Sequence, residues 1–291
     1  MALRLADGTT IRHLRRPPQG MRHRVLFGVE ESSGREVVAK IELIPGALES
    51  ERRALEWLTS QQGPAPRLLA SGPPANSNQY PGALCLVTER VAGTAPTSTD
   101  GWERLGVALA RLARMPWEGS GLPALDHREF LRLHERRVDD LGEALGRDFR
   151  AELPVVPPGY DKSPLTLTHG DPGPGNFLDD GADGFLIDWE DVVVAPGGLD
   201  LGRVTFIALL GAGPEGYAAR EHAARARAVR SGFLAESGAA PPGGDELTWW
   251  LAVAGVQFAH RRLERAGEPG VLPWLDAVSV LEAAFGPGAS G

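Results

Sequence analysis

The chain changes its hydrophobic pattern near residue 92, and this change limits what it can fold into. Before that point, short apolar runs end at turn residues. The runs at 24–29 and 36–41 flank Ser32-Ser33-Gly34, which is typical of a β-hairpin. A third apolar run, at 83–88, predicts a strand that is covered on both faces. The first part of the chain is therefore expected to form a sheet.

Helical spacing of apolar residues predicts helices in the rest of the chain. One helix is expected among the strands, at 47–60, because Pro45-Gly46 precedes it and Gly63-Pro64 follows it. After residue 92, leucines at 105, 109 and 112 recur at helical spacing, as do apolar residues between 130 and 145. Further helices are predicted at 199–210, 214–236, 245–266 and 273–285.

A second, smaller β signal interrupts the helical part. The signal consists of Leu-Thr-Leu-Thr at 165–168 and Phe-Leu-Ile at 185–187, and a loop rich in Gly and Pro separates the two segments. Strands with one helix, followed mostly by helices around a small β insert, predict an α+β fold with two lobes. We expect a small β-rich N-terminal lobe over 1–91 and a larger, mostly helical C-terminal lobe over 92–291.

Composition excludes several kinds of partner. The chain has 30 basic and 38 acidic residues, and its formal net charge of −8 argues against nucleic acid or an anionic membrane as the main partner. The sequence contains no apolar stretch of about 20 residues, and its start is too polar for a secretory signal peptide. The single cysteine, Cys85, permits no internal disulfide, so we expect a reducing, cytoplasmic location.

The loop between the two small β segments carries the residues with the most chemistry. Asp171 lies in His169-Gly170-Asp171 at the start of this loop, Asn176 follows five residues later, and Asp188 comes directly after the second β segment. Strand ends and loops expose polar side chains without burying them unpaired. Two carboxylates and a carboxamide that converge there would supply hard oxygen ligands for Mg²⁺ and leave one carboxylate to face a hydroxyl.

The order of these residues matches the arrangement found in kinases. That arrangement has a catalytic Asp, an Asn five residues later and a metal-binding Asp after the next strand. We therefore expect Asp171 to be catalytic and Asn176 and Asp188 to bind Mg²⁺, with His169 orienting the loop rather than acting as a base. The plainer alternative is a Gly/Pro turn that carries two solvated acids.

The same arrangement requires a lysine on an upstream strand and a glutamate on the following helix. Lys40 follows Val37-Val38-Ala39 and is one of only two lysines among the 30 basic residues. On a helix, Glu51 shares a stripe with the leucines at 48, 55 and 58, whereas the glutamates at 49 and 56 lie on another face. A carboxylate in an apolar stripe needs a partner, so we expect Lys40 and Glu51 to pair and to serve nucleotide binding. The alternatives are a solvent-facing Lys40 and a Glu51 that pairs with an arginine.

Residues 88–93 lie between the β-rich and the helix-rich parts. In a two-lobed nucleotide enzyme such a segment is the hinge, and its main-chain groups hydrogen-bond the edge of the adenine base. We therefore expect Glu89 and Val91 to bind the nucleotide. A plain linker between lobes is compatible with the same sequence.

These residues together resemble the aminoglycoside phosphotransferase family of small-molecule kinases, which includes choline-kinase-like and fructosamine-kinase-like relatives. The resemblance covers residues 20–210 and rests on three motifs: H-G-D-x-x-P-G-N at 169–176, I-D-W-E at 187–190 and D-L at 200–201. Weaker support comes from V-A-K at 38–40, E-x-x-A-L-x-W-L at 51–58 and V-A-G at 91–93.

The resemblance implies a protein-kinase-like fold and transfer of the γ-phosphate of ATP or GTP to a hydroxyl of a small molecule. Candidate acceptors are an aminoglycoside or another antibiotic, an amino alcohol and a sugar metabolite, and Glu190 and Asp200 are expected to support the site. Aminoglycoside enzymes of the family tend to bind polyamines with acidic C-terminal helices. After residue 200 this chain has nine acids and eight arginines, so a dedicated polyamine pocket is not predicted.

The chain departs from the kinase pattern at the phosphate loop. The glycine-rich loop of protein kinases is missing, and only Gln19-Gly20-Met21 and Gly28 lie in the corresponding stretch.

The alternative function from another class is a nucleotide-binding pseudokinase that acts as a sensor or scaffold. Residues 211–216 satisfy G-x-G-x-x-G, but Pro214 and the lack of successive β-α-β units favour a helix end and a turn.

Overall fold

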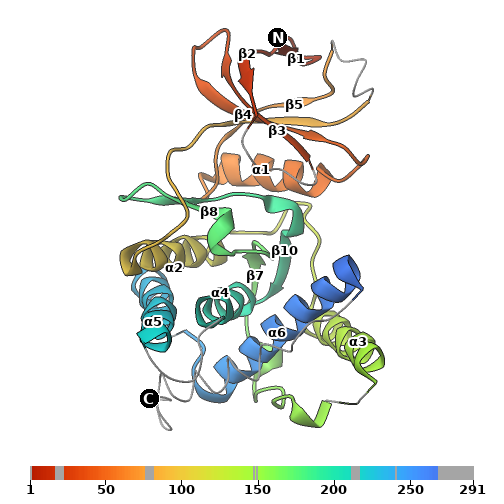
Figure 1. Ribbon diagram of the computed structural model, residues 1–291, viewed down its shortest axis with the longest axis vertical. Helices are drawn as coiled ribbons and strands as arrows, with labels where there is room; N and C mark the ends of the chain where they lie inside the picture. Colours follow the sequence, from red (N-terminus) through yellow and green to blue (C-terminus); the bar gives the residue numbers. More distant parts are fainter. Residues whose placement is uncertain are drawn as a thin grey trace.

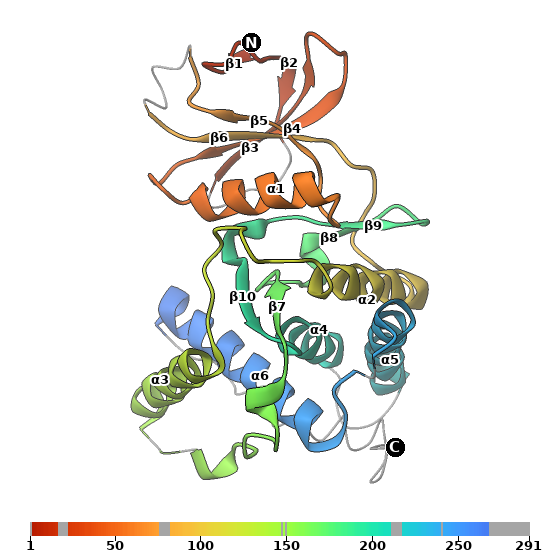
Figure 2. The same ribbon diagram turned by 180° about the vertical axis from the view of Figure 1, so that it is seen from behind.

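The N-terminal part of the computed structural model is a six-stranded antiparallel sheet (Figures 1 and 2). The structure describes residues 2–16, 23–75, 82–146, 148, 150–210, 217–239 and 241–267. The strands have the spatial order β1-β2-β3-β4-β6-β5. Their bounds are β1 (Leu3–Arg4), β2 (Thr10–Arg15), β3 (His23–Glu30), β4 (Glu36–Glu42), β5 (Leu68–Gly72) and β6 (Cys85–Glu89).

The central strand β4 has two different faces because successive side chains point to opposite sides. Val37, Ala39 and Ile41 are fully buried in a cluster with residues of β1, β2 and β6. Val38 and Lys40 lie on the opposite face, toward the helix α1 (Glu49–Gln61) and the rest of the molecule (Figure 1). The alternation therefore turns the only lysine of this sheet toward the interior of the molecule.

The helix α1 joins the sheet to the C-terminal part. Its buried face consists of Glu51, Ala54, Leu55 and Leu58. The three apolar residues belong to the same core cluster as residues of the C-terminal helices, so the hydrophobic core runs continuously between the two parts. Glu51 is the one carboxylate on this face.

The C-terminal part consists mainly of helices and also contains two pairs of short antiparallel strands (Figure 2). β7 pairs with β10, and β8 pairs with β9 in a hairpin that lies in the connection between β7 and β10. The helices are α2 (Thr99–Ala113), α3 (His127–Leu145), α4 (Leu199–Leu209), α5 (Tyr217–Ser237) and α6 (Gly244–Ala266). The strands are β7 (Leu165–Thr168), β8 (Phe177–Asp179), β9 (Gly184–Leu186) and β10 (Val193–Pro196). Single 3₁₀ turns lie at Arg150–Glu152, Tyr160–Lys162, Pro174–Asn176 and Trp189–Asp191.

Two glycines allow α2 and α5 to pack with their backbones in contact. A Cβ atom at Gly106 of α2 would overlap the main-chain oxygen of Val229, and one at Gly232 of α5 would overlap the main-chain oxygen of Glu103. Only a residue without a side chain fits at such a contact. Of these two helices, α2 also contacts the strands β7, β8 and β9.

The predicted α+β class with two lobes is confirmed, and each predicted helix or strand that falls on described residues lies within a few residues of an observed one. The sequence did not predict β1, β2, β5, β8 or β10. In β2 only Ile11 is buried, so an apolar run is missing from this edge of the sheet. The helix predicted at 273–285 and the G-x-G-x-x-G segment at 211–216 lie outside the described residues. Among the helices that are described, none has the length and apolar composition needed to span a membrane.

Candidate active site

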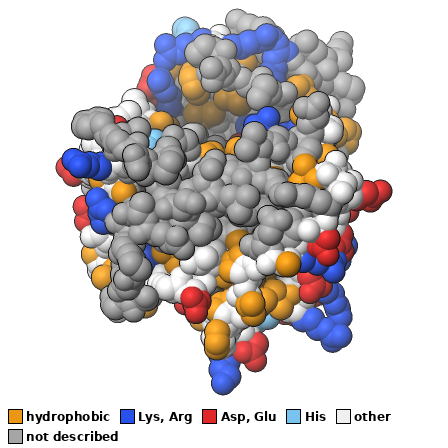
Figure 3. Space-filling view, turned by 60° about the horizontal axis from the view of Figure 1, so that its bottom comes forward, with side chains coloured by type: hydrophobic (Ala, Val, Ile, Leu, Met, Phe, Trp, Pro, Cys, Tyr) orange, Lys and Arg blue, Asp and Glu red, His pale blue; other side chains and the backbone are white. Residues whose placement is uncertain are grey.

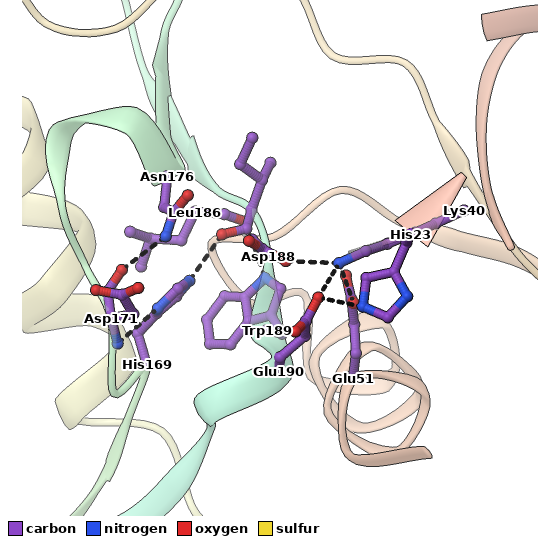
Figure 4. Close-up of polar contacts among 11 residues, drawn as sticks. His23, Lys40, Glu51, His169, Asp171, Asn176, Leu186, Asp188, Trp189 and Glu190 are labelled. Atoms are coloured by element: carbon purple, nitrogen blue, oxygen red, sulfur yellow. Dashed lines mark hydrogen bonds and ion pairs between the residues drawn. The ribbon is translucent and has the colours of Figure 1, made fainter. Parts of the chain in front are cut away.

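Lys40 and Glu51 are in direct contact across the interface of sheet and helix. The Nζ atom of Lys40 donates a hydrogen bond to Oε2 of Glu51 at 2.7 Å (Figure 4). The neighbouring glutamates at 49 and 56 bind Arg52 on the exposed side of the helix instead. The predicted contact between Lys40 and Glu51 is therefore present. Lys40 does not face the solvent, and among the described residues no arginine pairs with Glu51.

Two further carboxylates surround the same ammonium group. Lys40 Nζ lies 2.5 Å from Oδ1 of Asp188 and 2.7 Å from Oε1 of Glu190. Burial alone would lower the pKa of Lys40, but the attraction of Glu51, Asp188 and Glu190 raises it above its ordinary value. Lys40 is therefore held in its charged form.

The imidazole of His23 completes this cluster from the start of β3. Its Nε2 atom lies 2.6 Å from Oε1 of Glu190, the oxygen that Lys40 also contacts (Figure 4). Burial opposes ionisation of Glu190, but His23 and Lys40 together lower its pKa. The sequence analysis did not identify His23, since a histidine at the start of a strand carries no recognisable pattern.

The loop that holds Asp171 is fixed by its own backbone contacts. The carboxylate of Asp200, at the start of α4, accepts the main-chain N–H of His169 at 2.6 Å and that of Gly170 at 3.0 Å. Gly170 has a φ of +78°, in the left-handed region that favours glycine. Asn176 Nδ2 donates to the carbonyl oxygen of Asp171 at 2.9 Å, which closes the loop at its other end.

His169 connects this loop to the segment that carries Asp188. Its Nδ1 atom accepts the main-chain N–H of Asp171 at 3.3 Å, and its Nε2 atom lies 2.9 Å from the carbonyl oxygen of Ile187 (Figure 4). These two contacts fit a neutral imidazole that carries its proton on Nε2. Complete burial lowers the pKa of His169 to about 4, so it is neutral near pH 7. This arrangement fits the predicted orienting role, which stays a prediction.

Asp188 itself has an unusual backbone conformation. Its φ and ψ are both +67°, in the left-handed region that a non-glycine residue rarely adopts. Such conformations persist only where the surroundings hold them and are frequent at functional sites. The next residue, Trp189, is fully buried, and the centroids of its ring and the His169 ring are 4.5 Å apart. Asp188 is thus held with its side chain 46% exposed beside Lys40.

Both carboxylate oxygens of Asp171 contact arginines that the sequence analysis did not identify. Arg203 Nη2 of α4 lies 2.5 Å from Oδ1, and Arg261 Nη1 of α6 lies 3.1 Å from Oδ2. Arg261 also donates to Asp191 at 2.8 Å. In the structure Arg203 is buried, three residues after Asp200 on the mostly apolar helix α4.

One cavity of about 800 Å³ brings the predicted residues together. Figure 3 shows a hollow near the top of that view, floored by apolar side chains and edged by basic ones. His169 and Asp200 do not line the cavity, because they are buried behind the Asp171 loop. The predicted residues that line it are Lys40, Glu51, Glu89, Val91, Asp171, Asn176, Asp188 and Glu190.

The wall of the cavity near the hinge is apolar and offers one free main-chain donor. Val25 and Val38 line it from the sheet, and Leu178 and Ile187 line it from the C-terminal part. The N–H groups of Glu89 and the next residue donate to carbonyl oxygens of Arg67 and Glu36. Within the described part of the chain, the N–H of Val91 has no such acceptor. A flat aromatic ring with an acceptor at its edge fits this wall.

Asn176 and Asp188 offer oxygen atoms that suit Mg²⁺. The Nδ2 atom of Asn176 is engaged with Asp171, so its carboxamide oxygen is left for a ligand. Asp188 uses Oδ1 for Lys40 and keeps Oδ2. Carboxylate oxygens of Glu51, Asp188 and Glu190 also lie within 4.8 Å of one another. Hard oxygen donors at the rim of a cavity are the ligand type that Mg²⁺ takes.

The stretch at 19–21, considered for phosphate contacts, lies outside the described residues.

The two-lobed fold and the convergence of a lysine, two aspartates and an asparagine on one cavity define a kinase-type enzyme. The sequence model of the phosphotransferase enzyme family matches residues 13–235, and the chain belongs to this family. The predicted resemblance is thereby confirmed. No sequence among the curated proteins is significantly similar to the chain.

Solved structures of kinases share the fold. A choline/ethanolamine kinase family protein from Mesorhizobium loti has a TM-score of 0.58 at 17% identity, over 94% of this chain and 88% of its own. A thermostable mutant of aminoglycoside phosphotransferase APH(4)-Ia, in complex with AMP-PNP and hygromycin B, has a TM-score of 0.62 at 14% identity, over 96% of this chain and 95% of its own. Amicoumacin kinase hAmiN, in complex with AMP-PNP, Ca²⁺ and Ami, has a TM-score of 0.58 at 15% identity, over 93% and 87%. These similarities establish the protein-kinase-like fold that the sequence predicted.

Proposed function

We propose that this phosphotransferase moves the γ-phosphate of ATP, or of GTP, to a hydroxyl of a small molecule and that Mg²⁺ is its cofactor. The supporting observation is the convergence of Lys40, Asp171, Asn176 and Asp188 on one cavity. Similar structures hold AMP-PNP with hygromycin B or with Ami, which supports a nucleotide and a small-molecule acceptor. Antibiotics, amino alcohols and sugars are the acceptor classes to test, and a role in antibiotic resistance depends on that test.

The nucleotide is proposed to bind between two lobes. Residues 1–91 form the nucleotide-binding lobe and end in the hinge, and residues 92–291 hold the Asp171 loop and the acceptor site. The base lies against the apolar wall and accepts a hydrogen bond from the N–H of Val91, next to Glu89. Lys40, positioned by Glu51, contacts the phosphates.

Asn176 and Asp188 are the residues that would hold Mg²⁺ in this site, through the carboxamide oxygen and the carboxylate. When bound, Mg²⁺ would offset the charge of the phosphate oxygens as the transfer proceeds. Glu190 and Asp200 support the site in different ways. Glu190 links Lys40 to His23, and Asp200 fixes the loop that carries Asp171.

The transfer step places Asp171 next to the acceptor hydroxyl. The hydroxyl oxygen forms a bond to the γ-phosphorus while the bond from that phosphorus to the bridging oxygen of the nucleotide breaks. The hydroxyl proton passes to a carboxylate oxygen of Asp171, and ADP or GDP leaves with the electron pair of the broken bond. The transition state of such transfers is loose, so positioning and charge neutralisation supply most of the rate.

The alternative of a nucleotide-binding pseudokinase is not supported by the family match or by the kinase-like structures. We also propose a cytoplasmic location. The supporting observation is Cys85, a free cysteine that is buried in β6. Burial raises the pKa of its thiol to about 12, so it stays protonated and inert.

The experiment that tests the function measures ADP or GDP release with a panel of acceptors: aminoglycosides, other antibiotics, amino alcohols and sugars. Calorimetry with Mg²⁺ and ATP or GTP measures nucleotide binding separately. Asp171→Asn should reduce acceptor-dependent turnover roughly 100-fold or more and preserve nucleotide binding. The matched control is Asp183→Asn, an exposed residue that pairs with Arg111. Nucleotide binding without turnover for any acceptor would refute the transferase function.

A further inference from the structure

Two arginines from two neighbouring helices hold the carboxylate of Asp171. Arg203 Nη2 of α4 donates to Oδ1 at 2.5 Å, and Arg261 Nη1 of α6 lies 3.1 Å from Oδ2. The helices α4 and α6 lie side by side (Figures 1 and 2). Among the described residues, no other donor contacts these two oxygens. The pair Arg203 and Arg261 is called the arginine clamp below.

The backbone contacts of the loop leave the direction of this carboxylate open. His169 and Asn176 engage only main-chain groups of Asp171, its N–H and its carbonyl oxygen. The terminal torsion of an aspartate side chain is broad and is not confined to one staggered rotamer. The plane of the carboxylate is therefore set by what its oxygens contact, and these contacts come from the arginine clamp.

Arg203 is buried at this contact. Its side chain is 8% exposed, and in the described part of the chain Asp171 is the one carboxylate at ion-pair distance from it. Its Nη1 atom donates to Oε1 of Gln257 on α6 at 3.4 Å. A buried ion pair adds little to stability compared with apolar residues of the same size, but removal of one partner is costly. The pair is therefore better explained by its effect on Asp171 than by a gain in stability.

Arg261 connects the same carboxylate to the segment that carries Asp188. Its Nη2 atom donates to Oδ2 of Asp191 at 2.8 Å, at the end of the 3₁₀ turn that follows Asp188. The two segments are already in close contact, because a Cβ atom at Gly170 would overlap the main-chain oxygen of Asp191. Arg261 therefore fixes the Asp171 carboxylate relative to Asp188 as well as relative to α6.

The arginine clamp contacts Asp171 without taking up the cavity. Asp171 lines the cavity with 33% of its side chain exposed, and neither Arg203 nor Arg261 is among the lining residues. An ionised carboxylate has about four acceptor positions on its two oxygens. The clamp uses one position on each oxygen, so each oxygen keeps acceptor capacity for a group that enters the cavity.

We propose that Arg203 and Arg261 are positioning residues of the phosphate transfer and that they direct the Asp171 carboxylate toward the acceptor hydroxyl. The inference rests on the proposed function and adds two residues to it. Neither arginine contacts the nucleotide or the acceptor, because both act through Asp171. A misplacement of about 1 Å can cost roughly 100-fold in rate, so loss of the clamp should lower kcat and leave nucleotide binding unchanged.

The test is a double-mutant cycle. Arg261→Gln is the main variant because this side chain is 25% exposed, and Arg203→Gln is the second. Each is made alone and together with Asp171→Asn. Turnover is measured as ADP release with Mg²⁺, varied ATP and the acceptor of the panel above that gives the highest kcat.

Arg261→Gln alone should lower kcat roughly 10- to 100-fold and change KM for ATP less than about twofold. In the Asp171→Asn background, the same substitution should change kcat less than about threefold, because no carboxylate is left to position. A merely structural role would lower kcat by the same factor in both backgrounds.

A conservative variant and a neighbouring arginine serve as controls. Arg203→Lys should recover part of the kcat that Arg203→Gln loses, because the ammonium keeps a positive charge beside Oδ1. Arg262→Gln, at an exposed arginine next to Arg261 on α6, should behave like the wild type. Urea unfolding tests the contact without turnover: the midpoint shifts of Arg203→Gln and Asp171→Asn should be non-additive in the double variant.

Two results overturn the inference while the wild type is active: Arg261→Gln matches Arg262→Gln, or it lowers kcat by the same factor with and without the Asp171 carboxylate. The proposed function fails in a different way. The wild type then releases no ADP with any acceptor, and the positioning role falls with it, even where the urea midpoints show that the clamp holds Asp171.

Discussion

Asp200 accepts the main-chain N–H of His169 at 2.6 Å, although 31 residues separate the two in the chain. This contact attaches the loop that carries Asp171 to the first turn of α4. The loop position therefore depends on a helix that does not line the cavity. Burial raises the pKa of Asp200 to about 6, against the effect of its two N–H donors, so the carboxylate is ionised near pH 7 and accepts from both.

Replacing Asp200 by Asn should loosen this attachment. The carboxamide presents an NH₂ group to one of the two N–H donors, which leaves that donor unpaired. We expect kcat to fall by roughly 10- to 100-fold through misplacement of Asp171. Amide hydrogen exchange at 169–171 should become faster. The control is Asp245→Asn, an exposed acid in the first turn of α6. Unchanged exchange at 169–171 would contradict the proposed attachment.

Replacing Lys40 by Ala should reduce kcat/KM for ATP by roughly 100- to 1,000-fold, a size typical for loss of one preorganised charge partner. Glu51→Gln should have a smaller effect of the same kind, because Lys40 keeps Asp188 and Glu190 but loses its anchor on α1. Steady-state kinetics with varied ATP measure both changes. Glu56→Gln, on the exposed face of the same helix, should behave like the wild type, and a Glu51→Gln enzyme with full activity would speak against the positioning role.

The free energy of unfolding should depend on pH through His169. The folded protein holds this histidine neutral down to about pH 4, whereas the unfolded chain protonates it near pH 6.5. The unfolded state therefore binds more protons in this window, and roughly 3 kcal/mol of stability is lost as the pH falls from 6.5 to 4. Asp200, whose pKa is raised to about 6, acts in the opposite direction below about pH 6 and offsets much of this loss in the wild type.

Urea unfolding of His169→Gln at several pH values isolates the contribution of His169, because Asp200 is present in both proteins. We expect the variant to lose less stability than the wild type between pH 6.5 and 4. His13→Asn, at an exposed histidine with positive φ that Asn tolerates, is the control. Parallel pH profiles for His169→Gln and the wild type would show that this histidine is not held neutral.

Replacing Gly106 by Ala should destabilise the protein, although Ala favours helices by about 1 kcal/mol relative to Gly. The added methyl group would overlap the main-chain oxygen of Val229 and force α2 and α5 apart, which we expect to cost about 1–3 kcal/mol. Thermal unfolding measures the difference. Gly243→Ala is the control, because its added Cβ meets no atom within 4 Å. A more stable Gly106→Ala protein would show that the helices separate without cost.

The sequence predicted those parts of the site that follow from local periodicity. Lys40 was selected because the kinase arrangement requires a lysine on an upstream strand and the chain has only two lysines, and the helical stripe of α1 selected Glu51 from three glutamates. The spacing of Asp171, Asn176 and Asp188 resembled that of kinases closely enough to place all three on one cavity. Each of these inferences used residues that lie within a few turns or strands of one another.

The missed residues depend on long-range packing that no local pattern encodes. Arg203 reaches Asp171 from 32 residues away, and Arg261 comes from a later helix still. His23 meets Glu190 only because the sheet folds over the C-terminal part. The strands β2 and β5 were missed because their apolar positions are few or only half-buried.

The crowding of Glu51, Asp188 and Glu190 around Lys40 also bears on the order in which ligands enter. A single ammonium cannot balance that many carboxylates, so an uncomplexed polyphosphate tail would meet net repulsion on arrival. Nucleotide that already carries its own counter-ion escapes this penalty. The enzyme should therefore bind the nucleotide with a chelated metal ion more tightly than the metal-free nucleotide, even when no acceptor is present.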